Sequence, residues 1–237
     1  MILMKEKIIM KLSSETLGVL KNFGNINAGI LFKKGKTLKT VSNHKNILAE
    51  VVIQEEIPVE FGIYDLNNFL SVVSMHKDDT SLEFEEKQMK IVGQKGRSKQ
   101  TYRFCEPTMI TLPPEKQIAM PDPEINFSLT AEDFDWVLKE AGVLACPQIA
   151  IESTGSKISI ITLDLQNDSA HTGSLEIADG NGDKYRMVFK TENLIKILPG
   201  SYDVSISSKG ISHFKNKNVN LQYWITTEAG SKFEKGA

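Results

Sequence analysis

The sequence is poor in cysteine, has no long apolar run and carries almost no net charge. Its two cysteines, Cys105 and Cys146, are too few for a disulfide scaffold, and we expect free thiols in a reducing compartment. No apolar stretch approaches the roughly 20 residues of a membrane-spanning helix. Residues 1–7 alternate charged and apolar side chains, which does not fit a signal peptide, so we expect a protein that is not secreted. A formal net charge of -2 argues against binding nucleic acid through the whole surface, but allows a basic patch on one face.

Motifs for catalysis, metal binding and phosphate binding are also missing. The four histidines have no partner four residues away and no cysteine neighbour, so no zinc site is predicted. Residues 179–183 resemble the start of a calcium loop, but Lys184 and Lys190 stand where that loop needs Gly and Glu, which favours a hairpin turn. There is no phosphate loop and no Gly-x-Ser-x-Gly nucleophile motif. We therefore expect a protein that is not an enzyme and that binds no metal or cofactor. The alternative is a hydrolase whose active-site residues come from distant positions in the sequence.

What the sequence does contain is a repeated pattern. Residues 15–21 return as residues 133–139, and residues 64–72 return as residues 189–197, with helical spacing of apolar residues and in the same order. The separation is close to half the chain, so each copy is long enough to form its own core. The repeat predicts two domains of similar fold. Duplicated domains tend to build pseudo-symmetric assemblies rather than a single catalytic cleft.

Two periodicities predict the elements of each half. Alternating apolar and polar residues indicate many short strands, whereas helical spacing stands out at only four places, residues 14–23, 66–75, 130–141 and 191–197. Ser13 and Thr130 are the expected N-caps of the first and third helices. The prediction is an α+β fold of two similar domains, with antiparallel sheets and two helices each on one face.

A proline-rich segment, residues 105–124, separates the halves. It holds five of the eight prolines, which remove backbone donors and favour extended conformations, so we expect neither a helix nor a central strand there. The predicted organisation is a first domain over residues 10–104, this connector, and a second domain over residues 125–237. Apolar side chains in the connector either cover the edge of their own domain or form an exposed interaction patch.

Five segments in order match one known family. They are residues 10–13, 20–23, 26–31, 64–71 and 199–202. Together they resemble the sliding clamps of T-even-type bacteriophages, and residues 1–9 look like an N-terminal extension to that pattern. The resemblance implies a DNA polymerase processivity factor. It also implies a ring of three two-domain subunits around duplex DNA, with helices lining the hole and sheets forming the outer shell.

The resemblance assigns DNA contacts to the helices. A sliding ring needs phosphate contacts without base readout, which lysines and short amides on helix faces provide. The candidates are Lys21, Asn22, Lys139, Lys190 and Lys196, with Asn22 expected on the exposed arc of the first helix. Each lysine fits an ordinary solvated surface equally well. The third helix also carries four acidic residues, which a DNA-lining surface should not prefer; these are Glu132, Asp133, Asp135 and Glu140.

The resemblance also gives the connector a role. Clamps of this kind bind short peptides of replication proteins in an apolar pocket beside the connector and the C-terminal strand. The pocket residues carried over are Ile110, Leu112, Ile118, Met120, Tyr223, Trp224 and Ile225. Aromatic and Met side chains are typical interface anchors, although Trp224 in an alternating strand could equally be core.

The resemblance further implies how the ring closes and what it meets. Strands near residues 100–104 and 174–178 are expected to pair between subunits of a homotrimer, with Lys99, Arg103 and Glu176 setting partner choice. The implied partners are duplex DNA, the phage DNA polymerase, a clamp loader ATPase and late-transcription factors. The implied location is the cytoplasm of an infected bacterial host. A phage structural ring or baseplate protein is the alternative function.

Overall fold

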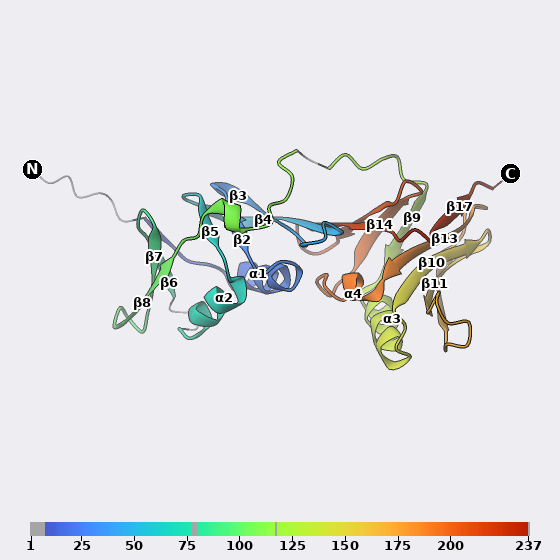
Figure 1. Cartoon of the computed structure of the whole chain (residues 1–237), viewed down its shortest axis with the longest axis horizontal. Coiled ribbons are helices and arrows are strands. Elements are labelled where there is room, and N and C mark those ends of the chain that lie inside the picture. Colours follow the sequence, from blue (N-terminus) through green and yellow to red (C-terminus); the bar gives the residue numbers. More distant parts are fainter. Residues whose placement is uncertain (1–7, 77–79, 117, 237) are drawn as a thin grey trace, which may run out of the picture. The chain divides into compact units, whose positions relative to one another are not determined.

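The computed structural model describes residues 8–76, 80–116 and 118–236, and the chain divides into two compact units (Figure 1). The first unit comprises Met1–Asn43 and Glu50–Pro113, and the second comprises His44–Ala49 and Pro114–Ala237. Among the described residues, each unit combines antiparallel strands with two α-helices, as the α+β prediction requires. No described helix has both the length and the apolar character that crossing a membrane requires.

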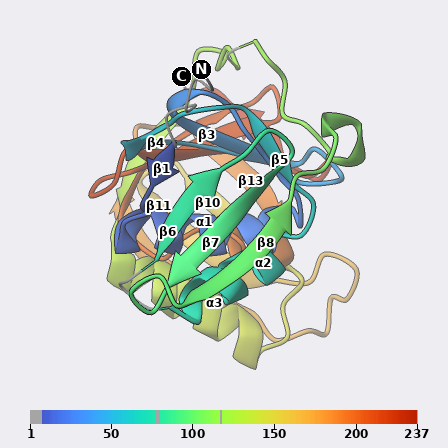
Figure 2. The ribbon, with the colours of Figure 1, turned by 90° about the vertical axis from the view of Figure 1, so that its left-hand side faces the viewer.

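The first unit contains α1 (Ser14–Ile26), α2 (Leu66–Ser74) and three groups of strands. One sheet has the order β1-β6-β7-β8, formed by β1 (Ile9–Met10), β6 (Ser81–Phe84), β7 (Gln88–Gly93) and β8 (Ser98–Arg103). Figure 2 looks onto this sheet, with α1 and α2 behind it. The other groups pair β2 (Ile30–Phe32) with β5 (Phe61–Ile63), and place β3 (Gly35–Val41) next to β4 (Ile47–Ile57).

The second unit contains α3 (Ala131–Val143), α4 (Thr191–Leu194) and two sheets. One has the order β12-β11-β10-β13-β17, formed by β10 (Gln148–Thr154), β11 (Lys157–Leu163), β12 (Gly173–Asp179), β13 (Lys184–Lys190) and β17 (Lys232–Glu234). The other has the order β16-β15-β14-β9, formed by β9 (Ile125–Leu129), β14 (Tyr202–Ser207), β15 (Ile211–Asn216) and β16 (Leu221–Thr226). The first three residues of β4, which belong to this unit, lie next to β16.

Three helices begin at a side chain that caps them. Ser13 Oγ accepts a hydrogen bond from the Thr16 amide at 3.2 Å, and Thr130 Oγ1 accepts one from the Asp133 amide at 3.1 Å. Both caps were predicted. Asp65, which was not, caps α2. These bonds satisfy amide groups that a helix leaves without internal partners.

The fourth helix is shorter than predicted, because α4 ends at Leu194 instead of continuing to residue 197. The Ile195 amide still reaches the Thr191 carbonyl four residues back (3.0 Å), but the next two reach back only three residues, from Lys196 to the Asn193 carbonyl (3.2 Å) and from Ile197 to the Leu194 carbonyl (3.4 Å). No side chain caps the start of α4. Pro199 disfavours helical conformation at Leu198, so the helical segment cannot continue past Ile197.

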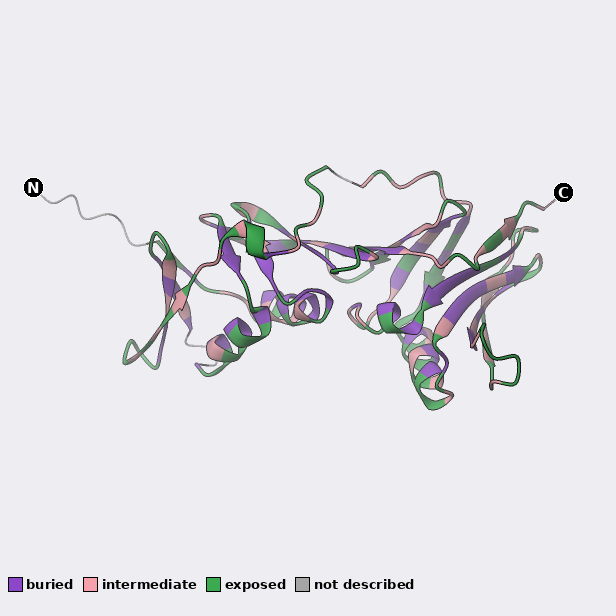
Figure 3. Cartoon of the chain, in the orientation of Figure 1, coloured by how far each residue is buried: buried purple, intermediate pink, exposed green. Residues whose placement is uncertain are grey.

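Each unit has its own aromatic core, and Figure 3 shows the buried sides of the helices and strands. In the first unit, the rings of Phe32 and Phe61 stack with centroids 4.5 Å apart. In the second, the ring of Tyr202 lies 5.9 Å from Phe134, 6.1 Å from Phe214 and 6.2 Å from Tyr223. The predicted repeat is therefore realised as two separately packed units.

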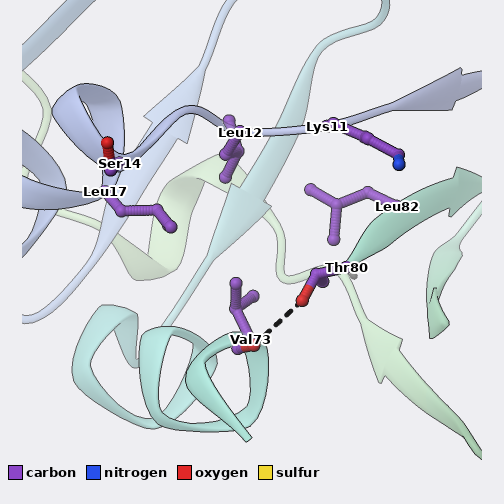
Figure 4. A pocket seen from close by; sticks show the side chains of 7 residues that line it. All are labelled: Lys11, Leu12, Ser14, Leu17, Val73, Thr80 and Leu82. Atoms are coloured by element: carbon purple, nitrogen blue, oxygen red, sulfur yellow. Dashed lines mark hydrogen bonds between the residues drawn. The ribbon is translucent and has the colours of Figure 1, made fainter. Parts of the chain in front are cut away.

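A small cavity of about 100 Å³ lies in the first unit (Figure 4). Thr80 closes part of it by donating its hydroxyl to the Val73 carbonyl at 3.2 Å. Ligand pockets usually enclose about 300 to 1,000 Å³, so this cavity does not indicate a small-molecule site. Its lining consists of Lys11, Leu12, Ser14, Leu17, Val73, Thr80 and Leu82.

The observed units differ from the predicted domain boundaries at both ends of the first domain. Ile9 pairs with Glu83 in the sheet, and the Ile8 carbonyl accepts the Phe84 amide at 2.9 Å, so the predicted extension over residues 1–9 is wrong for residues 8 and 9. Residues 1–7 lie outside the described residues. The connector divides after Pro113, because its first part packs on the first unit. It also contains a single 3-10 turn, Pro107–Met109, where no helix was predicted.

Candidate functional site

Helix α1 carries two of the residues that were predicted to contact DNA, Lys21 and Asn22, and only Lys21 is available for such a contact. Lys21 is exposed, but Asn22 is only 6% exposed. Asn22 follows Val19 by three residues and precedes Ile26 by four, so it belongs to the buried face of α1. The prediction that Asn22 lies on the exposed arc is wrong. Helical periodicity could have detected this, because both flanking apolar residues share its face.

The exposed face of α2 is polar but uncharged. Its solvent-facing side chains are Asn67, Asn68, Ser71 and Ser74. The two serines donate to carbonyls of the helix itself, at 2.8 Å each. The Asn67 side chain lies against Gly24 of α1, where an added Cβ would lie 2.5 Å from Asn67 Oδ1. This face offers short hydrogen-bonding groups and no ionic contacts.

The acidic residues of α3 have largely structural partners. Glu140 Oε2 accepts a hydrogen bond from Thr162 at 3.0 Å, so this carboxylate faces the sheet. Asp133 accepts the capping hydroxyl of Thr130 at 2.6 Å. Asp135 forms an ion pair with Lys139, with Nζ and Oδ2 2.6 Å apart. Lys139 is thus exposed but already paired, which reduces the net positive charge that it offers to a ligand.

The other two predicted lysines lie on either side of α4. Lys190 is the last residue of β13 and is exposed. Lys196 follows the end of α4 and is half-buried. The four lysines predicted to contact DNA therefore differ in availability: Lys21 and Lys190 are exposed, Lys139 is paired with Asp135, and Lys196 is half-buried.

The predicted peptide pocket is divided by the alternation of β16. Tyr223 and Ile225 have no exposed area, and Tyr223 packs against Tyr202 and accepts the Leu198 amide at 3.1 Å. Burial raises the pKa of Tyr223. The prediction that Tyr223 and Ile225 line a surface pocket is wrong, because successive strand residues face opposite sides of a sheet.

Trp224 lies on the other face of β16 but is only 7% exposed beneath the ring of His213, a residue that was not predicted, so Trp224 is a core residue and not part of a surface pocket. The ring of His213 stacks on Trp224 with centroids 4.9 Å apart, and a hydrogen bond of 2.9 Å joins His213 Nε2 and Gln222 Oε1. Burial lowers the pKa of His213. The hydrogen bond with Gln222 acts in the opposite direction but is the weaker effect. Trp224 and His213 face each other across paired strands. The alternation of apolar and polar residues predicts which face of its strand each residue occupies. It does not predict the register of strand pairing that places His213 opposite Trp224.

The connector residues of the predicted pocket belong to different units. Ile110 is 9% exposed and packs in the first unit, where a Cβ added at Gly29 or Gly62 would lie 3.3 Å from its side chain. Leu112, also in the first unit, is 39% exposed. Ile118 and Met120 belong to the second unit and are half-buried. A joint pocket formed by these residues stays a prediction.

Two outer strands carry opposite charges on corresponding faces. In β8, Tyr102 contacts Phe69 of α2 at 5.3 Å between ring centroids, so Lys99 occupies the helix-distal side, whereas Arg103 at the end of the strand lines a hollow beside α2. In β12, Glu176 and Asp179 both bind Lys157 of β11 at 2.9 Å. These bonds raise the pKa of Lys157. Two carboxylates shared by one lysine leave a net negative charge at this strand.

Both strands are the terminal members of their sheets, β12 next to β11 and β8 next to β7, and Figure 2 shows β8 beside β7. They are the strands in which inter-subunit pairing was predicted.

Among the described residues, no group of His, Cys, Asp and Glu side chains is arranged to hold a metal ion. Cys105 and Cys146 are free.

Two family models match consecutive parts of the chain. The model described as "DNA polymerase processivity factor" matches residues 12–112, and the model described as "gp45 sliding clamp, C terminal" matches residues 126–229. The chain is 34% identical over 226 residues to the sliding clamp of Vibrio phage KVP40, covering 93% of this chain and 100% of that protein. It is 31% identical over 230 residues to the sliding clamp of Enterobacteria phage T4, covering 94% and 98%.

Solved structures give the same fold at low sequence identity. PCNA from Thermococcus kodakaraensis aligns with a TM-score of 0.66 and 11% identity, covering 94% of this chain and 99% of that one. Proliferating Cellular Nuclear Antigen from Entamoeba histolytica aligns with a TM-score of 0.66 and 13% identity, covering 94% and 98%. With the fold of a two-domain clamp and this identity to phage proteins, the chain belongs to the family of bacteriophage sliding clamps, the processivity factors of DNA polymerase.

Proposed function

We propose that three copies of the chain close into a ring around duplex DNA and tether the phage DNA polymerase. The observation that carries the ring is the pair of outer strands, β8 with Lys99 and Arg103 and β12 with Glu176 and Asp179. An outer strand has unpaired backbone groups on one side, and opposite charges favour one partner over others. Because the two surfaces differ, they join head to tail, which is the type of contact that generates rings.

The helices form the DNA side of the proposed ring. Lys21 and Lys190 would contact phosphates, Lys196 would contribute from a half-buried position, and Lys139 would do so while shared with Asp135. The uncharged face of α2 adds weak hydrogen bonds. Few and weak contacts suit sliding, because contacts to evenly spaced phosphates change little from one position to the next.

The polymerase would bind beside the connector. The connector side chains with exposed area are Leu112, Ile118 and Met120, whereas Trp224 is only 7% exposed beneath His213. Exposed apolar side chains mark surfaces that bind other proteins. A clamp loader ATPase and late-transcription factors would use the same surface, in the cytoplasm of the infected bacterium.

Two measurements test the proposal. Native mass spectrometry at micromolar concentration should give a mass three times that of the 26.5 kDa chain, and the cognate polymerase should copy longer stretches of primed DNA when the protein is present. A protein that remains monomeric or dimeric contradicts the trimeric ring. A trimer that fails to lengthen the products contradicts the tethering role and leaves the assembly intact.

A further inference from the structure

The outward face of α3 presents two large apolar side chains to solvent. Trp136 is 59% exposed and Val143 is 84% exposed. They are seven residues apart, close to two helical turns, so they share one face of α3. Tryptophan is enriched among the residues that anchor protein interfaces. Lys139 lies on the same face, between Trp136 and Val143, and is paired with Asp135, so the face combines two exposed apolar side chains with one ion pair.

Contacts between α3 and its sheet determine where this face points. Glu140 follows Trp136 by four residues and lies on the adjoining side of the helix. Its carboxyl group reaches β11 and β12, because it binds Thr162 and because a Cβ added at Gly173 would lie 2.2 Å from it. Gly173 is the first residue of β12, the outer strand. Trp136 lies one turn before Glu140, on the side of α3 from which Glu140 reaches β12.

The first unit has a hollow beside its own open edge. The hollow encloses about 480 Å³ between α2 and β8. Tyr102 forms part of its wall and is held there by Phe69 and by a hydrogen bond from its hydroxyl to the Asp65 carbonyl at 3.0 Å. Burial raises the pKa of Tyr102, so it stays a neutral aromatic surface. The lining residues are Tyr64, Asp65, Asn68, Val72, Gln100, Thr101, Tyr102 and Arg103.

Pairing of the two outer strands would bring these surfaces together. Tyr102 of β8 faces α2, and Gly173 of β12 faces α3, so each helix covers the corresponding face of its sheet. When β8 of one copy lies against β12 of the next in one continuous sheet, α2 and α3 lie side by side on the same face. Lys99 of β8 and Glu176 of β12 would meet on the opposite face.

We infer that Trp136 of one copy docks into the hollow between α2 and β8 of the neighbouring copy, with Tyr64 and Tyr102 as its aromatic contacts. Offset and edge-to-face aromatic pairs favour this arrangement beyond the area that they bury. The contact extends the strand pairing into the helix layer. It rests on the proposed ring, and it specifies which side chain holds each joint of that ring.

Tryptophan fluorescence tests the docking without altering Trp136. The chain has two tryptophans, and Trp224→Phe leaves Trp136 as the sole emitter. In the assembled protein its emission should lie at short wavelength and resist quenching by iodide. On dilution into the monomer range, the emission should shift to longer wavelength and quenching should rise. Emission that is equally accessible to iodide in trimer and monomer would overturn the inference while the ring stands.

Matched variants test the energetic importance of the contact. Trp136→Ala, or Tyr64→Ala on the receiving side, should raise the concentration at which the assembly dissociates by about 10- to 100-fold. Val52→Ala serves as control, because Val52 is a 43% exposed apolar side chain on β4. Circular dichroism should be unchanged in all three. If both variants dissociate as the control does, the docking is refuted; if the wild-type protein never assembles, the ring proposal itself fails.

Discussion

Glu55 anchors the beginning of α1 to strand β4, and its removal should measurably destabilise the first unit. One carboxylate oxygen accepts the Ser13 amide at 2.5 Å, and the other accepts the Thr16 hydroxyl at 2.7 Å. Burial opposes the charged form, but the bonds from Ser13 and Thr16 outweigh it and lower the pKa of Glu55. Glu55→Gln keeps the shape of the side chain and removes its charge.

The expected loss follows from the two bonds. Hydrogen bonds to a charged group contribute about 1.5 to 3 kcal/mol each, and a glutamine amide retains only one acceptor oxygen. We expect Glu55→Gln to lower the free energy of unfolding by about 1 to 3 kcal/mol at pH 7. Glu56→Gln is the matched control, because Glu56 is the next residue of β4 and is exposed.

Acid should abolish the difference between the wild type and Glu55→Gln. The folded-state pKa lies below the ordinary value of 4.5, so the stabilisation is complete above that value and is lost as the pH falls through the lower folded pKa. Urea unfolding from pH 7 to pH 3, at one fixed protein concentration because assembly adds stability, measures this trend. A destabilisation that matches Glu56→Gln at pH 7, or that persists unchanged at pH 3, would refute the reasoning.

Three further outcomes are expected. Replacing Lys21 and Lys190 together by Glu should abolish the stimulation of the polymerase at low salt. Native mass spectrometry should still find the assembly, because exposed charges contribute little to folding. Unchanged product length would contradict the placement of these two lysines on DNA. Leu112→Ser, at a 39% exposed connector residue, should weaken calorimetric binding of the polymerase C-terminal peptide by about 1 to 3 kcal/mol, and equal affinity would move the site elsewhere. Arg103→Glu should weaken assembly and Glu176→Arg in the same chain should restore it, whereas failure of the double variant would show that these residues do not face each other across the joint.

The sequence predicted features that depend on neighbouring residues. Ser13 and Thr130 precede regular apolar spacing, so both helix starts could be located from capping chemistry. The last helix was predicted too long, because apolar side chains continue up to Ile197 although the helix itself ends at Leu194. Strand periodicity indicated β16 but not which face was covered, and that depends on the strands beside it.

The functional surfaces were less predictable, because they combine distant residues. Asn22 looked like an exposed amide beside Lys21, yet the packing of α1 places it inside. His213 became evident only through its register with Trp224. The two outer strands and their charged residues Lys99, Arg103 and Glu176 were predicted from the resemblance, and the observed order places both strands at the ends of their sheets. Family membership sets aside the baseplate and hydrolase alternatives.

The division of β4 between the two units makes the second unit depend on a distant peptide. Residues 44–49 belong to that unit, and the Asn46 carbonyl accepts the Thr226 amide at 3.0 Å beside β16. A fragment that begins in the connector would lack this strand and expose the backbone of β16, a site for aggregation. Protease cleavage of the connector alone would therefore not free a complete domain. Fragment complementation with a peptide spanning residues 44–49, instead of simple truncation, is the way to obtain the second unit by itself.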